Sequence, residues 1–310
     1  MKLSHLLWDA FCLSSLVGIW PRFVEPNLLT KVELELRLPG LKQDLTLLVF
    51  SDLHFHSRTS DRFLRKLVEK AEKSQPDLIF FLGDFLCHSR LYSKEKLERF
   101  LSRFSPPLGA FAILGNHDYS EPVSVNAEGD YDVVDNDHEF QKAFGRLASN
   151  IRPSGKRTGR LKNIKESREL AEALKSTPFR LLHNQTHFLK KAHLNITGLG
   201  EYMTGHFKPE IAFKGYQSQA PGIVLVHNPD ATPHLRQYPG QLILSGHTHG
   251  GQVNLPWVWK KLTLMENPQF KEGVFDLGDK TLFVSRGVGS VQPFRWYAPP
   301  EWVLLRLRAA

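Results

Sequence analysis

The stretch that decides the fold is LTLLVFSDLH, residues 45–54. Its first six residues are apolar or β-branched and predict a buried strand, which Asp52 and His54 follow. Because one residue separates these two, an extended backbone points both side chains to the same side. Polar groups at the carboxyl ends of strands form the sites of layered α/β folds. The stretch therefore predicts a strand that delivers a pair of metal ligands.

The same order of apolar strand and polar cluster returns downstream. Leu78–Leu82 runs into Gly83-Asp84, and Ala110–Leu114 runs into the sequence GNHD at 115–118. Three such junctions in succession favour parallel strands joined by right-handed crossovers. The connecting helices are predicted at Asp61–Lys73 and Lys94–Phe104.

The chain changes character after residue 118. Residues 119–178 are polar, then helical near Glu139–Leu147, then strongly basic, and they predict an insertion that forms a cap over the site. Short strands dominate beyond it and predict a two-sheet core flanked by helices. These strands are expected at Phe179–Leu182, Leu194–Gly198, Ile223–Val226, Leu242–Leu244, Val274–Leu277, Leu282–Val284 and Trp302–Leu307.

Length and charge narrow the class of protein. The chain has 310 residues, and we expect one large domain at 31–310 after an amino-terminal segment at 1–30. The formal charge of +8 predicts an anionic partner such as lipid headgroups, nucleotide phosphates or nucleic acid. The sequence has no nucleic-acid-binding motif, and we expect neither nucleic acid nor an obligate protein partner. Cys12 and Cys87 form no disulfide framework, which suits the cytoplasm.

The amino-terminal segment reads LLWDAFCLSSLVGIW at residues 6–20. It is apolar, is interrupted by Asp9 and is short for a bilayer span. It predicts a helix in the membrane interface with Trp8 and Trp20 at headgroup depth, attached peripherally to the cytoplasmic face of the inner membrane. The alternative is a helix packed on the protein's own core. Aromatic and basic residues at 255–264 and 294–297 predict further lipid-facing loops, with core packing as the alternative.

The polar clusters predict a two-metal phosphoester hydrolase. Two neighbouring cations lower the pKa of water and neutralise charge on phosphoryl oxygens, and they require carboxylate and imidazole ligands. Asp84 is expected to bridge the ions, and Asn116 to add an amide oxygen. The imidazoles are expected from His54, His227, His247 and His249. Such a mixed nitrogen and oxygen set suits two divalent ions, Mn²⁺ first and iron or zinc as alternatives.

His117 and Asp118 lie beside these ligands in the sequence. If Asn116 faces the metal, His117 is placed to donate a proton to the leaving oxygen, and we predict it as the general acid. Asp118 is then expected to fix the tautomer of His117 and to keep it protonated.

The motifs together resemble the calcineurin-like metallophosphoesterase superfamily, whose pattern runs D-x-H, G-D-x-x-D, G-N-H-[DE], H and G-H-x-H. The resemblance spans roughly Leu45 to Trp302 and implies a four-layer α-β-β-α sandwich with a cap-like insertion. One departure is Cys87, where many members carry a second, supporting aspartate. By that resemblance one metal is held by Asp52, His54, Asp84 and His249, and the other by Asp84, Asn116, His227 and His247.

Other stretches resemble a branch of membrane-associated bacterial phosphodiesterases. They are Arg22–Pro26, His227–Asp230 and Arg286–Gly289 with Pro299-Pro300-Glu301. Within this branch the chain is similar to the UDP-2,3-diacylglucosamine pyrophosphatases of lipid A biosynthesis in chlamydia-like bacteria. This implies a lipid-linked nucleotide substrate that is cleaved to UMP and 2,3-diacylglucosamine 1-phosphate. The alternative is a phosphodiesterase of broader or different phospholipid or nucleotide specificity. A non-catalytic scaffold is disfavoured because every ligand position is filled.

Overall fold

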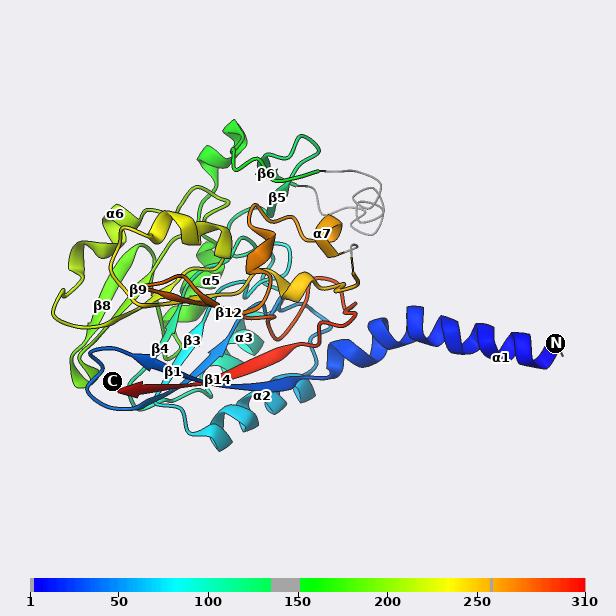
Figure 1. Cartoon of the computed structure of the whole chain (residues 1–310), viewed down its shortest axis with the longest axis horizontal. Helices are drawn as coiled ribbons and strands as arrows, with labels where there is room; N and C mark the ends of the chain where they lie inside the picture. The colour runs from blue at the N-terminus through cyan, green and yellow to red at the C-terminus, as the bar shows by residue number, and fades with distance from the viewer. Residues whose placement is uncertain (1–2, 135–150, 257–258, 310) are drawn as a thin grey trace.

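The computed structural model describes residues 3–134, 151–256 and 259–309. Two six-stranded sheets face each other, and helices cover their outer faces (Figure 1). This arrangement confirms the predicted four-layer α-β-β-α sandwich. Each sheet contains a set of parallel strands, and the carboxyl ends of the two sets lie on the same side of the molecule.

The first sheet contains the apolar strand that leads to Asp52 and His54. Its strands, in spatial order, are β1 (Thr30–Leu38), β14 (Glu301–Ala309), β2 (Leu45–Phe50), β3 (Leu78–Phe81), β4 (Ala110–Ala112) and β7 (Phe179–Leu181). The run from β2 to β7 is parallel, as predicted from the repeated strand-to-cluster order. β14 joins β2 antiparallel and links it to the edge strand β1.

The second sheet is built mostly from the second half of the chain. Its strands, in spatial order, are β12 (Gly273–Asp276), β13 (Thr281–Val284), β11 (Leu242–Ser245), β10 (Gly222–Leu225), β9 (Leu194–Gly198) and β8 (Gln185–Leu189). The four central strands are parallel, while β12 and β8 pair antiparallel at the two edges.

The helices form the two outer layers. The described helices of the body are α2 (Asp61–Ser74), α3 (Lys94–Leu101), α5 (Arg168–Lys175), α6 (Pro209–Ala212) and α7 (Trp259–Leu262). Ser60 caps α2 by accepting from the Phe63 amide at 3.1 Å. α2, α3 and α5 cover the first sheet, whereas α6 packs beside β8 of the second.

The alternation of β2 shows why two cores form. Leu47 and Val49 point between the sheets into a buried cluster that also contains residues of β10 and β11. Leu48 and Phe50 point the other way, toward the apolar face of α2. Because successive strand residues face opposite sides, an uninterrupted apolar run is what a sheet buried on both faces requires.

The predicted insertion at 119–178 divides in two. Its first part carries a hairpin of β5 (Val123–Val125) and β6 (Tyr131–Val133), which stands above the layers in Figure 1. Its last part contains α5, which packs against α3 and β7 as the helix between β4 and β7. The segment outside the layers therefore ends before α5. The helix expected near Glu139–Leu147 lies outside the described residues.

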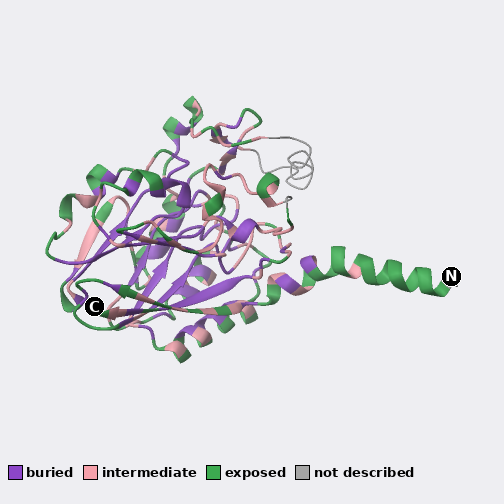
Figure 2. Ribbon diagram, in the orientation of Figure 1, coloured by how far each residue is buried: buried purple, intermediate pink, exposed green. Residues whose placement is uncertain are grey.

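The amino-terminal segment leaves the body as a rod. It consists of α1 (Leu3–Ser14), followed by a π-helical stretch, Ser15–Val24, and a short 3₁₀ turn, Glu25–Asn27. The rod projects well beyond the sheets in Figure 1, and Figure 2 shows α1 exposed along its length. The alternative of a helix packed on the protein's own core is therefore wrong for residues 4–14. Within the described part of the chain, no helix combines the length and apolarity that a membrane span needs.

Candidate metal centre

The side chains predicted as metal ligands meet where strands of both sheets end. Asp52 and His54 follow β2, Asp84 follows β3 and Asn116 follows β4. From the second sheet, His227 comes after β10, and the pair His247 and His249 comes after β11. Carboxyl ends of parallel strands meet at one edge of a sheet, and here two such edges face each other across the interlayer core.

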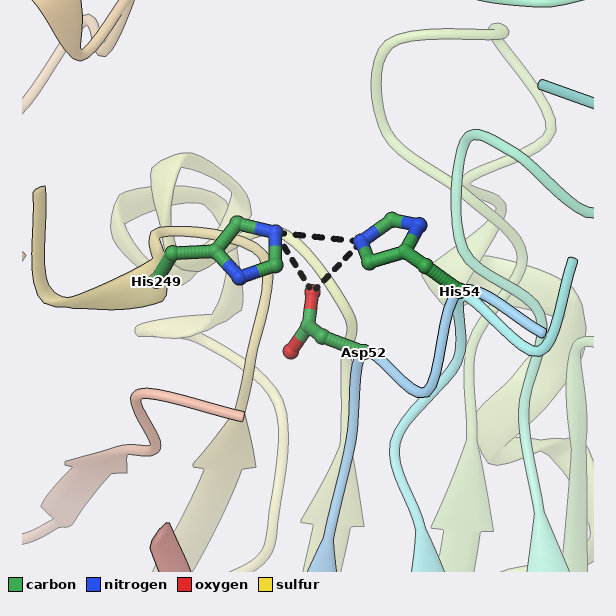
Figure 3. Close-up of side chains that lie close together, drawn as sticks. All are labelled: Asp52, His54 and His249. Carbon is green, nitrogen blue, oxygen red and sulfur yellow. Dashed lines mark hydrogen bonds and ion pairs between the residues drawn. The ribbon is translucent and has the colours of Figure 1, made fainter. Parts of the chain in front are cut away.

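One trio lies around Asp52. The Nε2 atoms of His54 and His249 are 3.1 Å apart, and each lies within 4.0 Å of the Asp52 Oδ1 atom (Figure 3). Two nitrogens and one carboxylate oxygen thus converge on one small volume. The Asp52 carboxylate also accepts from the His247 amide at 3.1 Å, which ties the loops of the two sheets together.

Asp84 stands between this trio and a second one. Its Oδ2 atom lies 3.6 Å from Nε2 of His54 and 3.3 Å from Nε2 of His227. His247 completes the second trio, with its Nδ1 atom 3.3 Å from Nε2 of His227. A carboxylate oxygen placed between two nitrogen sets is the arrangement that a bridging ligand needs.

Asn116 has one amide atom occupied and one unsatisfied. Its Nδ2 group donates to the Val123 carbonyl at 3.0 Å, whereas the buried Oδ1 atom has no hydrogen-bond partner. A buried polar oxygen without a partner costs free energy unless a cation or water satisfies it. His227 is oriented in the same sense, because its Nδ1 lies 2.6 Å from the Leu82 carbonyl and leaves Nε2 for an ion. These observations fit the residues to two divalent cations.

The buried carboxylates of the site favour a positive charge beside them. Burial raises the pKa of Asp52 to about 6, and Asp84 adds to the rise although His227 opposes it. Burial by itself disfavours the charged form of His227, but Asp84 and Asp52 raise its pKa to about 10. A proton on His227 thus balances the buried carboxylates when no cation is bound. Burial and the His227 charge lower the pKa of His247 to about 3, which keeps that imidazole neutral as a ligand must be.

The backbone at the site is held in an uncommon conformation. Asp52, His54, Asp84, His247 and His249 all have positive φ values, between 44° and 73°. Non-glycine residues adopt this left-handed region at a cost, and such residues gather at functional sites. The neighbouring loops therefore have to hold these turns in place.

Two glycines make the close approach feasible. A Cβ atom on Gly115 would collide with the Asp84 carboxylate, and one on Gly246 would come within 2.7 Å of Asp52 Oδ2. The glycines of the motifs thus give the carboxylates room.

His117 faces the same centre from the loop after β4. Its ring centroid lies 4.9 Å from that of His54, and its amide donates to Asp84 Oδ1 at 2.9 Å. His117, His54 and Asp84 form a third group whose ligand atoms lie close together. The residue is half-buried, with its Nδ1 atom on the buried side.

Asp118 is held by backbone amides of two neighbouring loops. Its two carboxylate oxygens accept from the Leu86 and Gly115 amides, each at 2.9 Å, and the residue is fully buried. Burial and the Asp84 charge raise its pKa to about 7, although these amides oppose the rise. The observed bonds of Asp118 join the loops after β3 and β4.

Arg295 was predicted to face lipid, and that expectation is wrong. Its side chain is completely buried and donates to the Arg286 and Ala298 carbonyls at 2.8 and 2.9 Å. One guanidinium nitrogen also lies 3.1 Å from Nδ1 of His249. Burial lowers the pKa of Arg295 to about 10. A single arginine among aromatic residues gave no sign in the sequence that it contacts a ligand.

Glu201 is a second residue that sequence reasoning missed. It is fully buried, its Oε2 atom accepts from the Thr204 amide at 2.8 Å, and its Oε1 atom has no hydrogen-bond partner. Burial raises its pKa to about 7, against the charge of His227. Its place after β9, a parallel strand beside β10, is the only sequence signal that points to it.

Comparisons with known proteins agree with this geometry. The calcineurin-like phosphoesterase family matches residues 45–251, which include every predicted ligand. The UDP-2,3-diacylglucosamine pyrophosphatase LpxG of Chlamydia trachomatis is 37% identical over 306 residues, covering 94% of this chain and 93% of its own. The LpxG of Chlamydia muridarum is 36% identical with the same coverage. The phosphodiesterase YaeI of Escherichia coli is 26% identical, covering 84% of this chain and 81% of its own.

The family uses a dinuclear metal centre, and the residues gathered here are able to hold metals. The chain therefore belongs to the calcineurin-like phosphoesterase family and is a hydrolase of phosphoester or pyrophosphate bonds.

Proposed function

We propose that the chain hydrolyses the pyrophosphate bond of UDP-2,3-diacylglucosamine, giving UMP and 2,3-diacylglucosamine 1-phosphate in lipid A biosynthesis. The observation that carries the proposal is the similarity to LpxG, which runs through nearly the whole of both chains. Similarity that covers 94% of this chain extends well beyond the metal motifs.

The proposed roles follow from the positions of the side chains. Asp52, His54, Asp84 and His249 would hold one ion, and Asp84, Asn116, His227 and His247 the other. Two divalent cations supply an activated water and neutralise charge on the phosphoryl oxygens. We assign Mn²⁺ to the site, with iron or zinc as alternatives, because the donor set mixes nitrogen with oxygen.

The general acid is proposed to be His117. Its ring lies beside His54 while its backbone is fixed by Asp84, so the imidazole faces the same volume as the ligands. From there it can protonate the departing phosphate oxygen. In this proposal Asp118 has a positioning role, because it joins the two loops that carry Asp84 and Asn116.

The amino-terminal rod is proposed to attach the protein to the cytoplasmic face of the inner membrane. Most large apolar side chains that are exposed in the described residues belong to this segment, and Trp8 is 64% exposed. The exposed apolar residues of the rod are Leu6, Leu7, Trp8, Phe11, Leu13, Leu16, Val17, Ile19, Trp20 and Phe23. An apolar surface of this kind is stable against lipid and unstable in water.

The direct test is to incubate the purified protein with UDP-2,3-diacylglucosamine and Mn²⁺ and to measure UMP by chromatography. We expect UMP to appear, and to disappear with chelator or in the Asp84→Ala variant. Protein that releases no UMP from this lipid, while its metals are bound, would contradict the substrate assignment. Activity retained by Asp84→Ala would contradict the assigned bridge.

A phosphodiesterase of broader or different specificity is the second candidate. It is favoured by the similarity to the phosphodiesterase YaeI, which covers most of both chains. Faster turnover of bis-aryl phosphates or cyclic nucleotides than of the lipid-linked nucleotide would identify it.

A further inference from the structure

A cavity of about 670 Å³ lies between the insertion and loops of the second sheet. Its walls come from three segments: the insertion around Arg157, the loop that follows β9, and the 3₁₀ helix η6 (Pro229–Leu235) with the turn after it. The loops at the carboxyl ends of the adjacent strands β9 and β10 thus form most of it. Its volume is in the range of small-molecule sites.

Aromatic rings form one side of the cavity. Tyr202 and His234 stack with their ring centroids 5.5 Å apart, and Phe207 meets Tyr202 edge-on at 5.8 Å. The Tyr202 hydroxyl lies 3.2 Å from Nε2 of His234, so the two rings hold each other in place. His234 is exposed and Phe207 partly so, and both leave ring surface for a flat ligand.

The cavity is also cationic. Arg157 holds its guanidinium carbon 4.9 Å above the Tyr202 ring and donates from Nε to the Tyr202 carbonyl at 3.1 Å. Arg236 lies in the turn after η6, and none of the described lining residues is acidic. Guanidinium groups suit phosphate oxygens, and the amide of Gln237 can both donate to and accept from a base edge.

The chain connects this cavity to the metal centre. The ligand His227 stands just before η6 and His234 stands in its last turn. At about 2 Å of rise per residue, their backbones are roughly 14 Å apart, a separation comparable with the length of a nucleotide. The charges of His227, Asp84 and Arg157 all act on the carboxylate of Glu201, the sequence neighbour of Tyr202.

We infer that this cavity binds the nucleoside half of the substrate, with the base against the His234 and Phe207 rings and the adjoining phosphate toward Arg157. The inference rests on the proposed function, since it assigns one half of a lipid-linked nucleotide to one site. It follows that Arg157 and His234 act in binding, while the metal ligands act on the bond between the phosphates.

The kinetic test compares two substrates in Arg157→Gln and His234→Ala. For UDP-2,3-diacylglucosamine we expect KM to rise about tenfold with kcat little changed, since base stacking and phosphate contacts contribute to binding. For bis-p-nitrophenyl phosphate, which has no nucleoside, we expect unchanged kinetics. Arg168→Gln is the matched control, because this exposed arginine begins α5 in the helix layer of the other sheet.

Direct binding of uridine 5′-monophosphate separates this inference from the proposed function. Saturation-transfer NMR should show base contacts in the wild-type protein and in Arg168→Gln, and a clear loss in both cavity variants. Unchanged KM together with unchanged nucleotide binding in those variants would overturn the inference. An equal loss of activity on both substrates would also overturn it, because it would indicate a structural role. Failure of the wild-type protein to cleave the lipid would instead contradict the proposed function, while nucleotide binding that depends on Arg157 would still support the cavity assignment.

Discussion

At the scale of single residues, Asn116 shows how one side chain serves both fold and chemistry. Its amide nitrogen fastens the loop after β4 to the Val123 carbonyl in the insertion. Its amide oxygen is buried and unsatisfied on the other side. The hydrogen bond decides which atom of the amide is left without a partner, so the insertion takes part in orienting a proposed ligand.

We predict that Asn116→Ala keeps the fold and lowers the number of tightly bound metal ions. The variant removes one oxygen donor of one ion, and turnover should fall by at least about a hundredfold, as expected when one ion of a two-metal site is lost. Elemental analysis after dialysis and the rate of UMP release measure the two effects. Asn163→Ala, at an exposed asparagine of the insertion, is the control. Full metal content in Asn116→Ala would show that Asn116 is not a ligand.

His117 can be tested through the leaving group. A general acid helps a poor leaving group and is dispensable for p-nitrophenolate, which departs without protonation. We predict that His117→Gln slows release of UMP by about 10² to 10⁴-fold and slows hydrolysis of bis-p-nitrophenyl phosphate much less. Equal losses on both substrates would point to a metal-binding or structural role for this imidazole.

Glu201 should make stability depend on pH. Burial raises its pKa in the folded protein from the ordinary value of 4.5 to about 7. Between these values the folded state keeps a proton that the unfolded chain has released, so the free energy of unfolding falls as pH rises through this window. The loss amounts to about 3 kcal/mol. In Glu201→Gln that part of the slope should vanish.

Urea unfolding at pH 5 and pH 8, in the presence of chelator, measures this difference. Relative to wild type, Glu201→Gln should gain stability at pH 8 compared with pH 5. Glu210→Gln, at an exposed position of α6, should keep the wild-type slope. Parallel curves for wild type and Glu201→Gln would show that the carboxylate is already ionised at pH 5.

The side chains that meet at this centre could be picked out from sequence because each motif joins a chemical type to a local spacing. Asp52 and His54, or His247 and His249, are separated by one residue and follow an apolar run. Arg295 and Glu201 have no such signature, because their roles depend on contacts between distant segments. Asp118 shares a motif with His117, yet its bonds depend on how the loop after β3 folds over it.

At the scale of elements, one loop connects the amino-terminal rod to the metal centre. Glu25 is buried at the base of the rod, where it accepts from the Trp20 indole at 3.0 Å and from the Ala298 amide at 2.6 Å. The Arg295 amide donates to the Pro21 carbonyl at 2.8 Å. The same loop places the Arg295 guanidinium against His249. We therefore infer that Arg295 is a positioning residue that acts through the proposed ligand His249.

We predict that loosening this loop weakens metal binding without touching a ligand. Arg295→Lys loses the forked contacts to the carbonyls and to His249, and Mn²⁺ affinity should fall about 10 to 100-fold. Glu25→Gln should cause a smaller loss through Ala298. Isothermal titration with Mn²⁺ measures both. Arg306→Lys on the exposed face of β14 is the control, and wild-type affinity in both loop variants would disprove the connection.

Which elements were predictable depends on burial. The doubly buried strands β2, β3, β10 and β11 carry continuous apolar runs and were predicted within two residues at each end. The edge strand β1 alternates exposed charged residues with half-buried ones, and it was not predicted. Its pairing with β14 comes from the far end of the chain. The helix α5 was likewise not predicted. It lies in a basic stretch, and only its buried face, which includes Leu170 and Leu174, is apolar.

At the scale of the whole molecule, the rod and the body differ in where their apolar side chains lie. The body buries its apolar residues in two cores, one between the sheets and one under the helices. The rod exposes its apolar side chains, although its base is fixed to the loop that reaches His249. The hydrophobicity of the rod could be read from sequence, whereas its projection from the body depends on the anchoring of Pro21 and Glu25. A membrane that takes up the rod would hold the metal centre close to a lipid substrate.

Removal of the rod should therefore separate membrane attachment from chemistry. We predict that a chain beginning at Pro21 loses the Trp20 indole but keeps the bond between Glu25 and the Ala298 amide. It should hydrolyse bis-p-nitrophenyl phosphate at the wild-type rate. It should lose cosedimentation with vesicles of anionic phospholipid, because the exposed apolar residues of α1 are the surface that lipid would bury. Its rate on vesicle-borne UDP-2,3-diacylglucosamine should fall, and detergent-dispersed substrate should restore that rate. Trp8→Ser in the full chain should show the same pattern in weaker form. Wild-type vesicle binding by the shortened chain would show that the body, not the rod, attaches to the membrane. Loss of bis-p-nitrophenyl phosphate hydrolysis by the shortened chain would show that the rod stabilises the fold.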